Sequence, residues 1–336
     1  FYMEHHMKAI EFDRHGPPHE VCHCIEVAEP NAPGPEEVVV AVEACSINPA
    51  DLLLIEGRYP GPKQLPARLG IEGVGRVTAT GSGVGHLDTG QRVLLLERTN
   101  WTEQICTAAN NVIAIDQGID PLQAAMMKVN PPTAMLMLSN YIDLAPGDWV
   151  IQNASNSAVG YHVIRLARAR GIHTVSVVRR QSAVATVAAL GADLVLVDDE
   201  NLAEKVRSGI GDANLPLALD AIGGAACLHL AQSLSIGGTV VNYGFLSGEP
   251  CMITPTETIV RDITLRGFWL ANHLGKATRQ AIEAIFTEVT SLIMDGTIAA
   301  PVEATYGLDE VKTALAHAGR GERSGKILFT PGGPIA

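Results

Sequence analysis

The sequence lacks the features of a membrane-spanning, disulfide-rich or nucleic-acid-binding protein. None of its apolar runs approaches the roughly 18 residues that a membrane helix needs. Six cysteines in 336 residues, with no C-x-x-C pair, do not form a disulfide framework. Basic residues number 24 against 36 acidic ones, and the net charge of −12 argues against nucleic acid or an anionic membrane as partner.

A secretory signal is also not visible near the first residues. Together with reduced thiols, this predicts an intracellular protein, cytoplasmic by default, or one of the mitochondrial matrix if a presequence was removed. Apolar residues make up 47% of the chain and charged residues 18%, as in globular proteins. At about 150 residues per domain, the length predicts two domains.

The first part of the chain has the pattern of short β-strands. We expect strands at Glu37–Ala44, Gly73–Thr80 and Gln91–Leu96, and their Gly and Pro punctuation predicts a partly open barrel. Gly81–Gly90 begins like a G-x-G-x-x-G loop, but a strand follows it instead of a helix, which favours a hairpin turn. Cys22-His23-Cys24 resembles part of a metal site, but no second pair of ligands has zinc spacing. We therefore interpret these residues as alternating residues of a strand.

From Asp120 onward the pattern changes to alternating helices and strands. Asp120 is a predicted helix N-cap, with the helix running to about Lys128; Asn130-Pro131-Pro132 then interrupts it before a helix at Thr133–Tyr141. Later strands are expected at Trp149–Asn153, His173–Val178, Leu194–Val197, Leu217–Ala221, Thr239–Tyr243, Ile263–Gly267 and Gly325–Thr330, and helices at Val159–Arg170, Ser182–Leu190 and Lys276–Met294. This alternation predicts a doubly wound parallel sheet inserted in a β-rich domain built from both ends of the chain.

The turn at Asn153–Gly160 lies between a predicted strand and a predicted helix, where a dinucleotide-binding loop belongs. Aligned on Gly160, Ser155 and Ser157 stand at the first two glycine positions of G-x-G-x-x-G. Small side chains still let the backbone approach a pyrophosphate. The alternative is an ordinary strand–helix turn, because the motif itself is weak.

The end of the next strand bears on which dinucleotide is bound. NAD-binding chains carry Asp or Glu there, about 20 residues on, to bind the ribose 2′-hydroxyl. This chain has Arg179 and Arg180 instead, whose guanidinium groups suit the 2′-phosphate of NADP. The alternative is that both arginines are solvated surface charges.

Several segments resemble the medium-chain dehydrogenases/reductases, and among them the zinc-independent, quinone-reductase-like trans-2-enoyl-CoA/ACP reductases of the mitochondrial type. The resemblance covers residues 8–330. Five segments carry it: Ile47–Asp51 followed by Gly57-Arg58-Tyr59, Val129–Pro131 followed by Thr133-Ala134, Val150–Gly160, Val177–Arg179, and Leu265–Leu270.

The resemblance implies a Rossmann NADP-binding domain at residues 123–270. It also implies a GroES-like catalytic domain made of residues 1–122 and 271–336. The implied activity is NADPH-dependent reduction of the C2=C3 bond of 2-enoyl thioesters, a reaction of fatty acid metabolism, by a homodimer. Zinc-using relatives have Cys at the position of Asn48 and His at that of Ile71. Asparagine and isoleucine side chains are not zinc ligands, so no metal is predicted.

The resemblance also assigns roles to single residues. Tyr59 corresponds to the proton donor, although from the sequence alone it would as readily pack over the Pro60–Pro62 turn. Trp269 has the alternative of a core aromatic, and Asn130 that of a helix-break cap. The implied NADP(H)-binding residues are Asn130, Asn156, Ser157, Ala158, Val159, Arg179, Arg180, Tyr243, Gly244, Phe245, Leu246, Phe268, Trp269, Leu270 and Lys326.

Two departures from the family pattern lie on the expected substrate side: Ile71 replaces Asn, and Pro132 adds a second proline. Two other functions therefore stay open. One is an NADPH:quinone or enone reductase, which needs no dedicated proton donor. The other is a non-enzymatic role, for which binding to nucleic acid is disfavoured by the net charge.

Overall fold

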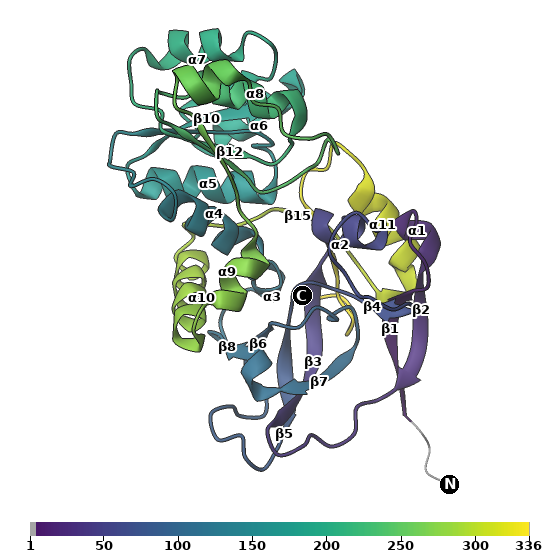
Figure 1. The fold of residues 1–336 in the computed structure, drawn as a ribbon. Helices are drawn as coiled ribbons and strands as arrows, with labels where there is room; N and C mark the ends of the chain where they lie inside the picture. Colours follow the sequence, from purple (N-terminus) through teal and green to yellow (C-terminus); the bar gives the residue numbers. More distant parts are fainter. Residues whose placement is uncertain (1–4, 336) are drawn as a thin grey trace. The chain divides into compact units, whose positions relative to one another are not determined.

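The structure is a computed structural model, and it describes residues 5–335. These residues form two compact units (Figure 1). Unit 1 contains the chain up to Val129 together with Glu283–Met294 and the segment from Ala300 onward; unit 2 contains Asn130–Ile282 and Asp295–Ala299. Among the described residues, no helix is long and apolar enough to span a membrane.

Unit 1 is built on two β-sheets. The larger has the order β15-β16-β3-β5-β6-β8, with β7 also paired to β3, and the smaller has the order β2-β1-β4. The strands are β1 (His6–Phe12), β2 (Cys22–Ala28), β3 (Glu37–Ser46), β4 (Ala67–Arg68), β5 (Gly73–Thr80), β6 (Arg92–Leu95), β7 (Gln104–Ala108), β8 (Val112–Ala114), β15 (Val302–Tyr306) and β16 (Lys326–Phe329). Valines alternate into the core along β3, and Trp101 packs edge-on against Phe329 at 5.1 Å between ring centroids. The last strand of the chain thus pairs with β3 in a sheet whose other strands, apart from β15, lie before residue 115.

Five α-helices accompany these sheets. They are α1 (Pro18–Val21), α2 (Pro49–Ile55), α3 (Pro121–Ala124), α10 (Arg279–Met294), whose residues belong partly to each unit, and α11 (Val311–Gly319). Helix α2 begins with a capping box, in which the Asn48 backbone N–H donates to Asp51 Oδ2 at 2.8 Å. The first helical turn after the strand is thereby fixed.

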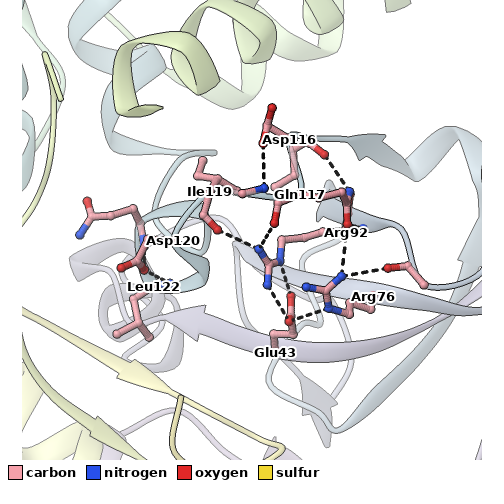
Figure 2. A network of polar contacts seen from close by, with 12 residues as sticks. Glu43, Arg76, Arg92, Asp116, Gln117, Ile119, Asp120 and Leu122 are labelled. Atoms are coloured by element: carbon pink, nitrogen blue, oxygen red, sulfur yellow. Dashed lines mark hydrogen bonds and ion pairs between the residues drawn. The ribbon is translucent and has the colours of Figure 1, made fainter. Parts of the chain in front are cut away.

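A partly buried ion-pair network joins three strands of the larger sheet (Figure 2). Arg92 donates to both carboxylate oxygens of Glu43, at 2.7 and 3.0 Å, and to the carbonyls of Gln117 and Ile119 at 3.0 and 2.8 Å. Arg76 adds a third bond to Glu43. Burial opposes ionisation of Glu43, but hydrogen bonds and charge from Arg92 and Arg76 outweigh it and lower the Glu43 pKa. The network ties β3, β5 and β6 to the segment that leads into α3.

Unit 2 is a six-stranded parallel sheet in the order β11-β10-β9-β12-β13-β14, which is the 3-2-1-4-5-6 order of doubly wound dinucleotide-binding folds. The strands are β9 (Trp149–Gln152), β10 (His173–Val178), β11 (Leu194–Val197), β12 (Leu217–Asp220), β13 (Thr239–Asn242) and β14 (Thr264–Gly267). The helices are α4 (Asn130–Ser139), α5 (Ala158–Ala169), α6 (Val184–Ala189), α7 (Leu202–Ile210), α8 (Gly224–Ser233) and α9 (Leu270–Lys276). Figure 1 shows α4 and α5 on one side of the sheet and α7 and α8 on the other.

Most of the expected elements are present. The strands Gly73–Thr80, His173–Val178 and Leu194–Val197 have the predicted bounds, and Gly81–Gly90 is the turn between β5 and β6. The expected doubly wound parallel sheet is confirmed. The strand interpretation of Cys22-His23-Cys24 is confirmed too, since these residues open β2.

Three helix predictions were wrong at their boundaries. The helix capped by Asp120 ends at Ala124 instead of Lys128. Asn130-Pro131-Pro132 does not interrupt a helix but begins α4, because first-turn residues need no N–H donor. The predicted helix Lys276–Met294 is α10, which ends at Met294 as expected but begins at Arg279, because Lys276 is the last residue of the preceding helix α9.

Candidate functional site

The turn between β9 and α5 has the geometry of an anion-binding loop. Ser157 is the N-cap of α5, and its Oγ accepts a hydrogen bond from the Gly160 N–H at 3.1 Å. A Cβ on Gly160 would lie 2.6 Å from the Ser155 carbonyl oxygen, so only glycine fits this close approach. Asn156 is exposed and Ser157 and Ala158 are half-buried, so these residues are open to a ligand, whereas Val159 is buried. A strand, a tight turn and a helix N-terminus suit a phosphate group.

The arginine pair lies at the same edge of the sheet. Strands β9 and β10 are parallel neighbours with Ser176 opposite Gln152, so the residues that follow both strands meet at their carboxyl ends. Arg179 is exposed and Arg180 is half-buried. The structure therefore places Arg179, Arg180 and the β9–α5 turn after neighbouring strands, at the same edge of the sheet.

Two further predicted segments follow β13 and β14 at this edge. A Cβ on Gly244 would lie 2.6 Å from the Ala221 carbonyl oxygen, which holds the Tyr243–Leu246 backbone close to the end of β12. Burial and then the charge of Asp220 raise the pKa of Tyr243, while a contact with Ser157 acts in the opposite direction. Among the described residues, the buried Tyr243 hydroxyl has no hydrogen-bond partner, which is unusual for a polar atom in the interior.

The segment after β14 contains one buried aromatic residue and one exposed aromatic residue. Phe268 is buried, stacks on His273 with centroids 4.6 Å apart, and contacts Tyr141. Trp269 is 43% exposed and Leu270 begins α9, so the alternative of Trp269 as a core aromatic is not what the structure shows. The exposed indole is available to a ligand of unit 2.

A polar cluster missed in the sequence organises this edge. Asp220 Oδ1 accepts hydrogen bonds from Asn153 Nδ2 at 2.7 Å and from the Ile222 and Gly223 N–H groups at 3.0 Å. Asn242 Nδ2 donates to Asp220 Oδ2 at 2.8 Å, and Asn153 Oδ1 accepts from the Ala221 N–H. These bonds fix the ends of β9, β12 and β13 relative to one another.

In unit 1, the predicted cofactor residue Lys326 belongs to a buried network. Its Nζ donates to Asn48 Oδ1 at 2.6 Å and to the Ile47 carbonyl at 3.2 Å. Asn48 Nδ2 in turn donates to Glu72 Oε1 at 2.7 Å, and Ser46 Oγ donates to the same oxygen. Burial lowers the pKa of Lys326 to about 8, although the charge of Glu72 acts to raise it.

The same network reaches the end of unit 1 at Val129. Glu72 Oε2 accepts from the Val129 N–H at 2.9 Å, and Lys128 Nζ donates to the carbonyls of Ile71, Leu96 and Glu97 at 2.6 to 2.8 Å. Burial lowers the pKa of Lys128 to about 8 as well. The chain just before Asn130, the first residue of α4, is therefore held by buried polar contacts.

Tyr59 lies in the turn after α2. It follows Gly57, whose φ of +77° lets the chain reverse there, and its half-buried ring packs against the core cluster of unit 1. The ring is therefore held by the core of unit 1, with part of the side chain exposed to solvent.

The residues at the zinc-ligand positions of zinc-using relatives do not fit a zinc ion. Asn48 has its amide oxygen bound to the Lys326 ammonium and its amide nitrogen bound to Glu72 and Ser46. Ile71 offers only an apolar side chain. A cation at Asn48 would meet the positive charge of Lys326, so these residues do not fit a zinc ion.

The sequence and fold are similar to those of known reductases. Residues 34–126 match the family model of the alcohol dehydrogenase GroES-like domain, and residues 158–287 match that of the zinc-binding dehydrogenases. The mitochondrial enoyl-[acyl-carrier-protein] reductase of Rattus norvegicus is 34% identical over 317 residues, which cover 92% of this chain and 85% of the rat protein.

Two solved structures superimpose on nearly the whole chain. A putative NADPH:quinone reductase from Bacillus thuringiensis has a TM-score of 0.89 and 28% identity, covering 97% of this chain and 99% of its own. A complex of Etr1p with NADP and crotonyl-CoA has a TM-score of 0.89 and 25% identity, covering 97% and 100%.

Proposed function

Because the chain belongs to the medium-chain dehydrogenase/reductase superfamily and resembles its mitochondrial-type enoyl reductases, we propose that it reduces the C2=C3 bond of 2-enoyl thioesters with NADPH. The substrate is an acyl group carried on CoA or on acyl carrier protein. The main support is the likeness over 97% of the chain to an enzyme complex that contains NADP and crotonyl-CoA. This activity belongs to fatty acid metabolism.

The carboxyl edge of the unit 2 sheet suits NADP(H). In this proposal, the β9–α5 turn binds the pyrophosphate through Asn156, Ser157, Ala158 and Val159, and Arg179 and Arg180 bind the 2′-phosphate. NADPH, when bound, supplies the hydride that adds to C3 of the enoyl group. The remaining contacts are assigned to Asn130, Tyr243, Gly244, Phe245, Leu246, Phe268, Trp269, Leu270 and Lys326.

Tyr59 is the proposed proton donor. Addition of a hydride at C3 leaves an enolate, which must be stabilised and then protonated at C2. The part of Tyr59 that is open to solvent suits this role, and the hydrophobic core beneath the ring holds the side chain in place. Tyr59 is thus a catalytic residue of the proposal.

The proposal extends to organisation. Residues 1–122 and 271–336 form the catalytic domain and residues 123–270 the NADP-binding domain, and the enzyme works as a homodimer. Strand β14 is an edge strand of the unit 2 sheet with exposed residues, which leaves it free to pair with another copy. The compartment, cytoplasm or mitochondrial matrix, stays a prediction.

NADPH oxidation with crotonyl-CoA tests the role of Tyr59. Tyr59→Phe is expected to lower kcat/KM by about 10²- to 10⁴-fold, the usual contribution of a positioned proton donor. Tyr306→Phe is the matched control, since Tyr306 is also half-buried in unit 1 but bonds His317 at 2.8 Å. An unchanged kcat/KM in Tyr59→Phe would remove Tyr59 from the mechanism.

The arginine pair has its own test. The double variant Arg179→Gln, Arg180→Gln is expected to raise KM for NADPH by at least tenfold and to leave KM for NADH nearly unchanged. Equal effects on both cofactors would mean that the arginines do not bind the 2′-phosphate.

A second candidate is an NADPH:quinone or enone reductase, favoured by the likeness to the Bacillus thuringiensis structure. A panel of enoyl-CoA, enone and quinone substrates, run with NADPH and with NADH, separates the two. A higher kcat/KM with a quinone than with every enoyl thioester, unaffected by Tyr59→Phe, would favour this second function.

A further inference from the structure

Three metal-ligating side chains of unit 2 lie together outside the proposed cofactor residues. Asp220 ends β12, Cys227 is in the first half of α8, and Cys251 follows the β13 segment. One carboxylate oxygen and the two Sγ atoms all lie within 4.8 Å of one another. Asp220 and Cys227 are fully buried, whereas Cys251 is partly exposed and connects the cluster to solvent.

The backbone holds the two cysteines on facing elements. The Gly224 N–H donates to the Pro250 carbonyl at 3.1 Å, and the Met252 N–H donates to the Gly224 carbonyl at 3.3 Å. Gly224 begins α8 one turn before Cys227, so these bonds position Cys251 beside it. The approach of the thiols is therefore fixed by the fold.

The two oxygens of Asp220 have different surroundings. Oδ1 accepts three hydrogen bonds of 2.7 to 3.0 Å from Asn153 and the backbone. Oδ2 accepts one short bond from Asn242 and a longer one from Gly223 at 3.2 Å, and its remaining side faces the Cys251 Sγ at 3.9 Å. Oδ2 is thus the carboxylate oxygen that accepts from the Cys251 thiol, while the amides fix the carboxylate in place.

We propose that Asp220 Oδ2, Cys227 Sγ and Cys251 Sγ form a binding site for a soft or borderline divalent cation of the Zn²⁺ or Cd²⁺ class. Two thiolates and a carboxylate are ligands that these ions accept in tetrahedral sites, and water entering beside Cys251 supplies the fourth ligand. Asn153 and Asn242 are positioning residues that orient the ligating carboxylate. The site is in unit 2 and is separate from Asn48 and Ile71 of unit 1.

Charge balance favours replacement of the two thiol protons by a divalent cation. Before binding, the site holds one carboxylate and two neutral thiols. The cation displaces two protons, and the three anionic ligands then surround a charge of +2, so the net charge of the site stays at −1. All hydrogen-bond donors to Asp220 are amides, backbone N–H groups or a thiol, so no protein cation has to be displaced.

Cd²⁺ titration of the full-length, reduced and chelator-treated protein tests the site. We expect one equivalent bound, with an ultraviolet thiolate-to-metal absorption band, release of two protons per ion, and a rise in Tm with added Zn²⁺ or Cd²⁺. Asn242→Ala should weaken binding by about 10- to 100-fold without removing a ligand.

Single cysteine variants complete the test. Cys227→Ser and Cys251→Ser should each abolish the band, whereas Cys106→Ser should not. Cys106 is a matched control because its thiol also faces a carboxylate, that of Glu37 at 3.6 Å. The proposal is overturned if the reduced protein gives no band, or if the band persists in both Cys227→Ser and Cys251→Ser. It is also overturned if the thiols react to a Cys227–Cys251 disulfide under oxidant while the reduced protein binds no Cd²⁺.

Discussion

The two units stabilise a buried carboxylate in different ways. In unit 1, Glu72 shares Asn48 with the ammonium group of Lys326, and a second buried lysine, Lys128, lies nearby. In unit 2, Asp220 is surrounded by amides and backbone N–H groups. The first arrangement depends on the protonation of its partners, whereas the second depends only on geometry. The stability of unit 1 should therefore vary with pH through these lysines, and unit 2 should respond mainly to loss of the carboxylate.

Removal of the unit 2 carboxylate should have the largest effect. Asp220→Ala removes the carboxylate that accepts from Asn153 Nδ2 and from the Ile222 and Gly223 N–H groups in a buried place, while Asn242 Nδ2 keeps the Gly244 carbonyl. We expect the free energy of unfolding of unit 2 to fall by about 3–5 kcal/mol. Native-state hydrogen exchange of peptides from β12 measures this. Asp193→Ala is the control: its carboxylate is 35% exposed and accepts from His173 and the Thr174 N–H, so its loss should cost less, about 1–2 kcal/mol. Equal costs for the two variants would contradict the comparison.

Removal of the unit 1 ammonium should have a somewhat smaller effect. Lys326→Met leaves Asn48 Oδ1 and the Ile47 carbonyl without a donor, but it also removes the cost of burying a charge. A loss of about 2–4 kcal/mol is expected in exchange of β3 peptides. Lys205→Met, which removes an exposed pair with Asp199, serves as the control and should stay within about 0.5 kcal/mol. If Lys326→Met is as mild as its control, the ammonium is not what balances Glu72.

Alkaline pH should sharpen the contrast between the units. Burial holds the pKa of Lys128 and Lys326 at about 8, below the ordinary 10.5, so the unfolded chain binds more protons between these values. The free energy of unfolding of unit 1 should therefore rise from pH 8 toward pH 10.5, by on the order of 1–3 kcal/mol. Urea unfolding followed by exchange of β3 peptides measures it. Lys326→Met should reduce the rise; a decrease with pH in the wild type would contradict the assignment.

An exposed charge of unit 1 should have the smallest effect. Arg76 binds Glu43 with a side chain that is 40% exposed, in contrast to the buried Arg92 (Figure 2). Arg76→Ala should lower the free energy of unfolding by about 0.2–1 kcal/mol in urea titrations, and Arg14→Ala, at a more exposed pair, by less still. A cost as large as that of Lys326→Met would show that burial is not what sets the strength of these pairs.

Strand positions could largely be predicted from the sequence, because runs such as Leu194–Val197 are apolar throughout and end at turn residues. Helix boundaries were harder to predict. Proline is compatible with the first turn of a helix as well as with a break, and the sequence alone does not distinguish these uses at Pro131 and Pro132. The amphipathic helix α7 was missed because it is short and its neighbours are turn-like.

The β9–α5 turn could be placed from its position between a strand and a helix, although its sequence motif was weak. The contacts of Asp220 could not, because Asn153 and Asn242 each end an apolar strand in the way that many turn residues do. Their meeting depends on the strand order β9-β12-β13, which only the fold provides. The bond between Lys326 and Asn48 spans 278 positions of sequence, beyond any local pattern.

The pairing of β16 with β3 bears on how the protein is made. Leu328 lies opposite Ser46, so a central strand of unit 1 comes from residues that leave the ribosome after all of unit 2. Unit 2 is nearly continuous along the chain and can form while synthesis proceeds, whereas the N-terminal sheet keeps an open edge until its last partner arrives. During that interval Cys45 and Ser46 at the end of β3 wait for their partner, whereas the valine-rich part of the strand already pairs with β5 and β7, so this end of the sheet is the last to be completed.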